Sequence, residues 1–227
     1  MQERLQKFIS SAGIASRRSA EKFMLEGKVK VNGKVIKEMG TKIDPSKDQV
    51  EVEGKKIKLQ KKIYLLLNKP RKYVTTRKDK LNRKTVYDLL PEEYRNLVWP
   101  VGRLDFTTEG LLLFTNDGEL TQDLTHPSKG HEKEYEVILD RELSAGRLEK
   151  IRTGITLGDK KTSPAKVRVD GKIVHLIIHE GWNRQIKRMF AVFGLTVRSI
   201  KRIRIGKLKL KELQLGQHKL IEKKEII

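Results

Sequence analysis

The chain has 227 residues, with 50 lysine and arginine residues against 29 aspartate and glutamate residues, which gives a formal net charge of +21 at pH 7. This charge exceeds what solubility requires and predicts a polyanionic partner, with nucleic acid as the first candidate. Without cysteine the chain can form no disulfide, thiolate nucleophile or thiolate zinc site, and its apolar runs are too short to span a bilayer. The first residues do not resemble a signal peptide, so we expect a cytoplasmic protein that does not associate with membranes.

The length fits a small domain joined to a larger one, and we place these domains at residues 1–60 and 61–227. Apolar periodicity over residues 3–11 predicts a helix, and Ser16 is placed to cap a second helix. Arg17 and Arg18 fall in the first turn of that second helix, where the helix dipole disfavours cations. We therefore expect both arginines to contact phosphate.

Short strands complete the predicted first domain. Asn32-Gly33 lies between two runs rich in valine and isoleucine and is a strong signal for a type I′ hairpin, and Glu53-Gly54 marks a second turn. Residues 1–62 contain 16 basic and 8 acidic residues, so this part of the chain is basic by itself. A solvated basic surface is the alternative interpretation of these charges.

A new apolar strand is expected to begin at residue 63 and to stop at Asn68-Lys69-Pro70. The apolar pattern predicts further strands at residues 73–75, 98–104, 110–115, 133–139, 165–169, 173–179 and 196–205. Helices are predicted at residues 86–90, 119–125, 144–153 and 184–193. Because strands outnumber helices and several follow one another directly, we predict an α+β fold with a mixed, mainly antiparallel sheet flanked by helices.

Residues 101–118 read as strand, polar loop and strand. Asp105 lies where a buried strand enters the loop, which is a rigid position suited to a nucleophile or a base. Aspartate also commonly caps loops, so its position alone leaves both roles open. The five histidines form no closely spaced ligand pair, and we expect no metal site.

The string Gly102-Arg103-Leu104-Asp105 resembles the signature of pseudouridine synthases. Three further segments resemble other blocks of that family: Asn68-Lys69-Pro70, Glu132-Lys133-Glu134-Tyr135 and residues 180–190. Residues 1–60 resemble the small RNA-binding domain first described in ribosomal small-subunit protein four. The chain is thus similar over nearly its whole length to the bacterial pseudouridine synthases that modify ribosomal RNA.

This resemblance implies that Asp105 is the catalytic carboxylate, which would start cleavage of the glycosidic bond by attacking the nucleoside or by removing a sugar proton. Tyr135 would stack on the target base and help to remove the proton from carbon five, although a half-buried strand aromatic is the alternative from the residues alone. Lys187 would pair with Asp105, but lysine cannot reproduce the bidentate fork of the arginine found in many relatives. The reaction needs no cofactor or metal.

The resemblance also suggests Arg103 as a contact to RNA phosphate or as a filler of the space left by a flipped nucleotide. Lys69 is included among the expected RNA contacts. Residues 182–211 contain ten basic and no acidic residues. Since a merely solvated face normally mixes charge signs, we predict a phosphate track there, with Arg184 and Arg188 as its first contacts.

We therefore predict isomerisation of a uridine to pseudouridine in ribosomal RNA, with the blocks at residues 84–91 and 124–127 favouring the large subunit. The alternatives are an enzyme for small-subunit ribosomal RNA and a non-catalytic RNA-binding factor in ribosome assembly. The expected partner is ribosomal RNA or an assembly intermediate, and the chain is expected to be a monomer. Lys72 stands where many relatives have glycine, and Trp182 replaces a residue that is usually basic, so the shapes of these two loops stay open.

Overall fold

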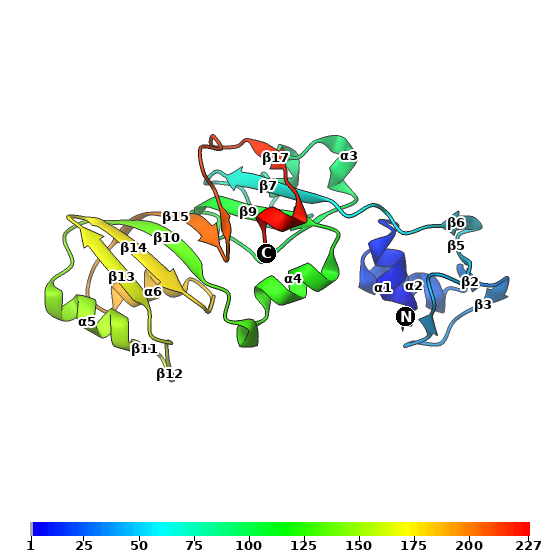
Figure 1. Ribbon diagram of the computed structural model, residues 1–227, viewed down its shortest axis with the longest axis horizontal. Helices are drawn as coiled ribbons and strands as arrows, with labels where there is room; N and C mark the ends of the chain where they lie inside the picture. The colour runs from blue at the N-terminus through cyan, green and yellow to red at the C-terminus, as the bar shows by residue number, and fades with distance from the viewer. Residues whose placement is uncertain (1) are drawn as a thin grey trace. The chain divides into compact units, whose positions relative to one another are not determined.

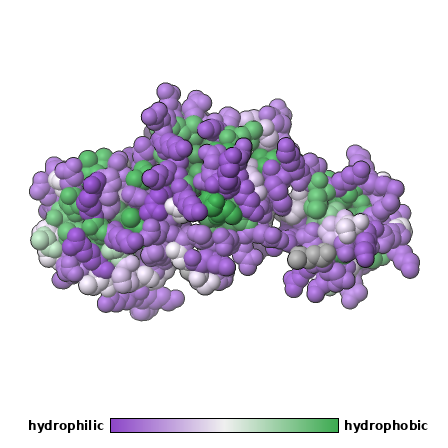
Figure 2. Space-filling view, viewed as in Figure 1, coloured by the Kyte–Doolittle hydropathy of each residue, from purple (hydrophilic) through white to green (hydrophobic). Residues whose placement is uncertain are grey.

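The computed structural model describes residues 2–227, which form two compact units that we describe separately. The first unit comprises the residues up to Ile63 together with Pro91–Trp99 and Thr115–Gly118, and the second comprises Tyr64–Leu90, Pro100–Phe114 and Glu119–Ile227. The visible surface of each unit is mostly hydrophilic, with small hydrophobic areas (Figure 2). Within the described residues, no helix is long and apolar enough to cross a membrane.

The first unit combines helices with short strands. Its elements in the N-terminal region are β1 (Glu3–Arg4), α1 (Leu5–Ser11), α2 (Arg17–Leu25), β2 (Val29–Val31), β3 (Lys34–Val35), β4 (Lys42–Ile43), β5 (Val50–Val52) and β6 (Lys55–Ile57). Ser16 accepts a hydrogen bond from the Ser19 amide at 3.1 Å, which confirms the predicted cap of α2. Asn32 and Gly33 have φ values of 52° and 80°, as the predicted hairpin requires. Four strands form a sheet in the order β3-β2-β5-β6.

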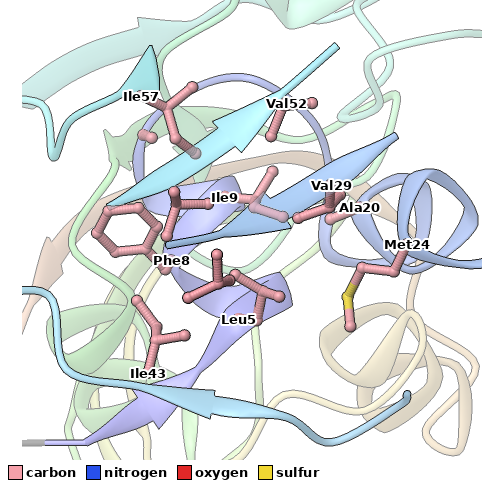
Figure 3. Close-up of a cluster of buried hydrophobic side chains, with 12 residues drawn as sticks. Leu5, Phe8, Ile9, Ala20, Met24, Val29, Ile43, Val52 and Ile57 are labelled. Atoms are coloured by element: carbon pink, nitrogen blue, oxygen red, sulfur yellow. The ribbon is translucent and has the colours of Figure 1, made fainter. Parts of the chain in front are cut away.

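Apolar side chains from α1, α2 and the strands meet in the core of this unit (Figure 3). Leu5 and Ile9 are fully buried on one face of α1, because residues four apart are neighbours on a helix. Met24 of α2 and Val29 of β2 are also fully buried. Each large side chain of this kind contributes roughly 1.5–3 kcal/mol through burial, so the unit has a hydrophobic core of its own.

The second unit is built on a nine-stranded sheet whose main path runs β13-β14-β10-β15-β9-β7-β17. The strands are β7 (Tyr64–Lys69), β9 (Glu109–Thr115), β10 (Lys133–Leu139), β13 (Lys166–Asp170), β14 (Ile173–Ile178), β15 (Val197–Ile205) and β17 (His218–Leu220), with β8 (Trp99–Pro100) and β16 (Leu208–Lys209) off this path. The β10 strand pairs antiparallel with β14 and β15, whereas β15 and β9 are parallel. Figure 1 shows β7 beside β9 and β17. This mixed sheet confirms the predicted α+β fold.

The helices largely follow the prediction. They are α3 (Glu92–Arg95) in the first unit, and α4 (Gly118–Thr125), α5 (Ala145–Thr153) and α6 (Gln185–Ala191), with short 3-10 helices at Val86–Leu89, Pro127–Lys129 and Lys223–Glu225. The β11 (Thr156–Leu157) and β12 (Lys160–Lys161) strands form a separate hairpin. The elements α3, β11, β12 and β17 were not predicted from the sequence.

Two predicted strands are wrong in whole or in part. Residues 73–75 form only an isolated bridge between Val74 and Thr85, and the strand predicted at residues 98–104 is reduced to β8. Gly102 has a φ of 72°, which ends the extended conformation. The Thr75 hydroxyl donates to the Leu104 carbonyl at 2.7 Å, so a side chain takes the place of a strand partner there.

Candidate active site

A cavity of about 300 Å³ lies in the second unit, at the lower end of the volume range for small-molecule sites. It is lined by Arg103, Leu104, Asp105, Thr108, Tyr135, Ile178, Ile200 and residues 181–187. The lining contains five of the nine predicted site residues: Arg103, Asp105, Tyr135, Arg184 and Lys187. Segments far apart in the sequence therefore bring the predicted carboxylate, phenol and amine to one cavity.

The loop that carries Asp105 is fixed by the side chain of Lys69, the last residue of β7. The Lys69 ammonium donates to the carbonyl oxygens of Asp105 at 3.1 Å, Thr108 at 2.8 Å and Pro70 at 3.0 Å. Three acceptors match the three protons of an ammonium group. The backbone of Asp105 and that of Thr108, three residues later, are thus tied to one strand.

Lys69 was expected to contact RNA, and the structure contradicts this expectation. Its side chain is fully buried, with 0% exposure, so it offers no surface to a phosphate. Burial lowers the pKa of Lys69 from 10.5 to about 8, while the charges of Asp105 and Glu109 act in the opposite direction. A lysine that sequence reasoning assigned to the surface is therefore an internal support of the Asp105 loop.

Two further contacts hold this loop. The Lys72 amide donates to the Phe106 carbonyl at 2.7 Å, and the Leu104 amide donates to the Thr75 hydroxyl at 3.3 Å. Lys72 has a φ of 66°, in the left-handed region that glycine adopts most easily. Lysine stands here where many relatives have glycine, and it still adopts the left-handed conformation of the turn.

Lys187 lies on α6, half-buried at the cavity, and donates a hydrogen bond to the Thr107 hydroxyl. Burial lowers the pKa of its ammonium group, the charge of Arg184 lowers it further, and the Asp105 carboxylate opposes both effects. In the described part of the chain Lys187 forms no ion pair with Asp105. The predicted contact between these two residues is thus replaced in this structure by an electrostatic interaction at longer range.

Tyr135 is presented to the cavity by β10 and is only 7% exposed. The pairing register of β10 with β15 shifts beside it, because Glu134 faces Arg204 whereas Tyr135 faces Arg202. The β15 strand therefore has one extra residue at this point, which is a β-bulge. Bulges of this kind change the direction of nearby side chains, and this bulge lies on β15 across from Tyr135 of β10.

Residues 181–185 form another wall of the cavity, and side-chain hydrogen bonds that involve Glu180 hold this wall. Glu180 accepts from the Gln185 amide group at 2.5 Å and from the backbone and hydroxyl of Ser163 at 3.1 and 3.3 Å. Gln185 in turn accepts from the Trp182 amide at 3.0 Å. Arg184 has a left-handed conformation with φ 49° and ψ 30° immediately before α6. This network fixes the turn that places Trp182 and Arg184 at the cavity.

Several of these supporting residues were missed by sequence reasoning. Gln185 lies inside the block that carried the family resemblance, and that block was the available signal. Ser163 and Thr107 give no comparable signal, because their contacts join segments separated by 17 and 80 residues. Such supports become visible only when the chain is folded.

The predicted phosphate track at residues 182–211 is only partly supported. Arg202 is 3% exposed and donates to the Leu111 carbonyl at 2.9 Å, because β15 is a central strand with β10 on one side and β9 on the other. Arg204 pairs with Glu134 at 2.7 Å and with Glu132 at 3.0 Å. These two arginines stabilise the sheet and are not available as phosphate contacts.

Three other predicted RNA contacts lie outside the cavity lining. Arg188 is exposed on α6 and donates to the Leu157 carbonyl of β11 at 3.1 Å. Arg17 and Arg18 are exposed in the first turn of α2, in the first unit. Among residues 2–227, no group of three histidine, aspartate or glutamate side chains is placed to hold a metal ion.

The chain is similar to known proteins over most of its length. Residues 63–192 match the sequence model of the RNA pseudouridylate synthase family, and residues 3–50 match that of the S4 domain. An uncharacterized RNA pseudouridine synthase of Aquifex aeolicus is 41% identical over 232 residues, covering 100% of this chain and 93% of the relative. The ribosomal large subunit pseudouridine synthase B of Bacillus subtilis is 42% identical over 234 residues, covering 99% and 94%. A crystal structure of a pseudouridylate synthase superposes with a TM-score of 0.73 at 32% identity, covering 98% of this chain and 97% of the other.

Proposed function

The chain belongs to the RNA pseudouridylate synthase family and is an RNA-modifying isomerase, and we propose that its target is a uridine of large-subunit ribosomal RNA. Two relatives support this choice of substrate. The Bacillus subtilis protein, similar over its whole length, is named for the large ribosomal subunit, and so is a Pseudomonas aeruginosa protein that is 36% identical over 236 residues. The S4 domain is an RNA-binding module, and we keep the proposed division at residues 1–60 and 61–227.

Asp105 is the proposed catalytic carboxylate, and the observation that carries this role is its place at the cavity on a loop fixed from inside by Lys69. A reacting group gains most when its support is rigid, since small displacements are costly in rate. Tyr135 is the proposed stacking partner of the uracil and the group that assists loss of the proton at carbon five. Lys187 is proposed to keep Asp105 ionised when substrate fills the cavity.

The reaction conserves the elemental composition of the nucleoside, with one hydrogen exchanged with solvent. The bond between the sugar and N1 of uracil breaks, the base rotates, and a bond forms between the sugar and carbon five. The proton on carbon five then leaves to solvent and N1 gains a proton, so no electron acceptor or group donor is consumed. The carboxylate, phenol and amine of this cavity are sufficient side-chain chemistry for such an isomerisation.

The target base must leave its stack to enter a cavity of this kind. Arg103 and Arg184, both exposed at the cavity, are the proposed contacts to the phosphates next to the flipped nucleotide. Arg188, Arg17 and Arg18 are the proposed contacts to more distant RNA. Ribosomal RNA, free or in an assembly intermediate, is the proposed partner of a monomeric cytoplasmic enzyme that does not bind membranes.

Release of tritium from RNA labelled at carbon five of uridine tests this proposal. The chain is expected to release tritium from unmodified large-subunit ribosomal RNA, and the Asp105→Asn variant is expected to bind that RNA without release. Activity on small-subunit RNA alone would overturn the choice of subunit. Binding without release from either RNA would favour a non-catalytic assembly factor, and undiminished release by the variant would overturn the role of Asp105.

A further inference from the structure

A second cavity in the same unit lies outside the proposed active site. It has a volume of about 700 Å³ and shares no lining residue with the first cavity. It is formed by the turn after β15, by β16, by residues 210–213 and by parts of β7, β17 and the C-terminal segment. We call it the lysine groove, defined by Leu66, residues 207–213, Lys219, Ile221 and Glu225.

The floor and the rim of the lysine groove differ in character. The floor is made of apolar side chains of the core: Leu66, Leu208, Leu210, Leu213 and Ile221. The rim carries four exposed lysines: Lys207, Lys209, Lys211 and Lys219. Two carboxylates, Glu212 and Glu225, also line the groove, and Glu225 already accepts a hydrogen bond from the Glu222 amide at 3.0 Å. The rim is therefore predominantly cationic.

The ammonium groups of the four rim lysines have no ion pair or hydrogen bond with any residue that the structure describes. Some cations of the same unit are paired, such as Lys166 with Glu132 at 2.7 Å and Arg204 with Glu134 at 2.7 Å, whereas Lys172, for example, has no side-chain partner among the described residues. What distinguishes the rim lysines is that four of them line one groove. Surface lysines that serve only solubility are normally interspersed with acidic residues. Four unpaired lysines around one groove therefore indicate a polyanionic occupant, and the apolar floor can receive the face of a base or ribose.

The groove is attached to the strand that supports the active site. Asn68 donates to the Leu213 carbonyl at 2.6 Å, and the Gly216 amide donates to the Asn68 carbonyl at 2.8 Å. Asn68 directly precedes Lys69, which holds the Asp105 loop. Along β15, Ile200 at the first cavity and Ile205 at the turn into the groove are five residues apart, or roughly 17 Å at the usual rise of a strand. The groove is therefore at a fixed distance from the catalytic candidate.

We propose that the lysine groove binds a segment of the substrate RNA outside the target uridine and so helps to set which uridine reaches the first cavity. This inference rests on the proposed action on ribosomal RNA, because it extends that substrate over a second surface. Phosphate contacts position a nucleic acid without reading its bases. A fixed phosphate-binding groove beside the active site would thus define the register of a folded RNA.

The test compares two variants of the full chain that lose the same charge. The groove variant carries Lys207→Gln, Lys209→Gln, Lys211→Gln and Lys219→Gln, and the control variant carries Lys150→Gln, Lys160→Gln, Lys161→Gln and Lys172→Gln. All eight lysines are exposed in the same unit. Binding of unmodified large-subunit ribosomal RNA is measured by fluorescence anisotropy between 50 and 300 mM salt, together with tritium release from the same RNA and from a short stem–loop that contains the target uridine.

The groove variant should raise the Kd for the long RNA about tenfold or more at low salt and reduce the slope of log Kd against log salt by up to roughly 3, as expected for the loss of four phosphate contacts to a single strand. The short stem–loop should lose much less affinity, and the control variant should resemble the parent chain on both RNAs. Equal losses in groove and control variants, or equal losses on long and short RNA, would overturn the inference. If the parent chain releases no tritium from ribosomal RNA, the proposed function fails, while the binding comparison still decides whether the groove holds RNA.

Discussion

The two walls of the first cavity are held in different ways. The Asp105 wall is fixed through backbone atoms by the buried Lys69 ammonium, whereas the wall at residues 180–185 depends on side-chain bonds among Glu180, Gln185 and Ser163. Buried hydrogen bonds are shielded from competing water, while those of exposed side chains exchange readily with it. The wall at residues 180–185 is held partly at the surface, because the Ser163 bonds to Glu180 are exposed although Gln185 itself is buried. We therefore expect the Asp105 wall to be the more rigid of the two and the wall that recognises the nucleotide to be the more adjustable.

Lys69→Met should have the largest effect, because it removes the ammonium group that holds the Asp105 wall. Methionine has a similar length but no protons to donate, so the carbonyls of Asp105 and Thr108 lose their partner and the loop shifts. A displacement of about 1 Å at a reacting group costs roughly 100-fold in rate, and single-turnover tritium release should fall by that amount. Lys172→Met, at an exposed turn, is the control. Full activity of the Lys69 variant would show that the loop holds its position without this ammonium.

Glu180→Gln tests the adjustable wall. The substitution places an amide group where the Gln185 and Ser163 donors now meet a carboxylate, so at least one hydrogen bond is lost. With about 1 kcal/mol for a lost bond, KM should rise roughly fivefold to tenfold while kcat changes little. Glu149→Gln, on the exposed surface of α5, should leave both constants unchanged. A large fall in kcat at constant KM would mean that this wall also positions the reacting groups.

The pH dependence of the reaction tests whether the Lys69 ammonium holds the Asp105 wall, because burial lowers the pKa of Lys69 to about 8. Above that pH its neutral amine has two protons for three carbonyl acceptors, so kcat should fall several-fold as pH rises from 7 to 9. The free energy of unfolding should rise over the same pH range in which kcat falls. Between pH 8 and 10.5 Lys69 binds more protons in the unfolded chain than in the folded one, so its contribution to this free energy increases with pH. Lys69→Met should lack both trends. If they persist in that variant, another group causes them.

Lys72→Gly should have the smallest effect. Lysine at a φ of 66° carries strain of roughly 1–2 kcal/mol that glycine avoids, but glycine also adds freedom to the unfolded chain. The net change in the free energy of unfolding should therefore be a stabilisation of up to about 1 kcal/mol, measured by urea denaturation. The hydrogen bond from the backbone amide at position 72 to the Phe106 carbonyl is retained, so activity should be unchanged. Destabilisation would indicate that the Lys72 side chain itself stabilises the turn.

Local signals predicted most regular elements of the fold. The Asn32-Gly33 turn, the Ser16 cap and the alternating pattern of β10 depend on neighbouring residues, and the sequence contains all of that information. Residues 73–75 failed for the opposite reason, because their hydrogen bonds go to residues distant along the chain. The backbone of Val74 bonds to residues 84 and 86, and the Thr75 hydroxyl bonds to Leu104, some thirty positions away. The short β17 strand was invisible because it is defined by its pairing with β7 and not by its own composition.

The site was predicted to a similar extent. The blocks of the family resemblance led to Asp105, Tyr135 and Lys187, and the structure brings all three to one cavity. Their roles stay proposals. Burial was what the sequence did not display: Lys69 and Arg202 read as surface cations in a strongly basic chain, yet both are inside. Three backbone carbonyls accept the protons of Lys69, and the Leu111 carbonyl accepts one from Arg202. A linear pattern does not show such arrangements.

The pairing of β7 with β17 has a consequence for the order in which the protein is made. Leu67 faces His218, so the strand that ends in Lys69 leaves the ribosome about 150 residues before its outer partner. Until then β7 has an unpaired edge, which is a site for incorrect association with other strands. The β7 strand that supports Asp105 is therefore fully paired only after β17 has been synthesised, and a nascent chain without β17 should depend on chaperones more than one that has just acquired it.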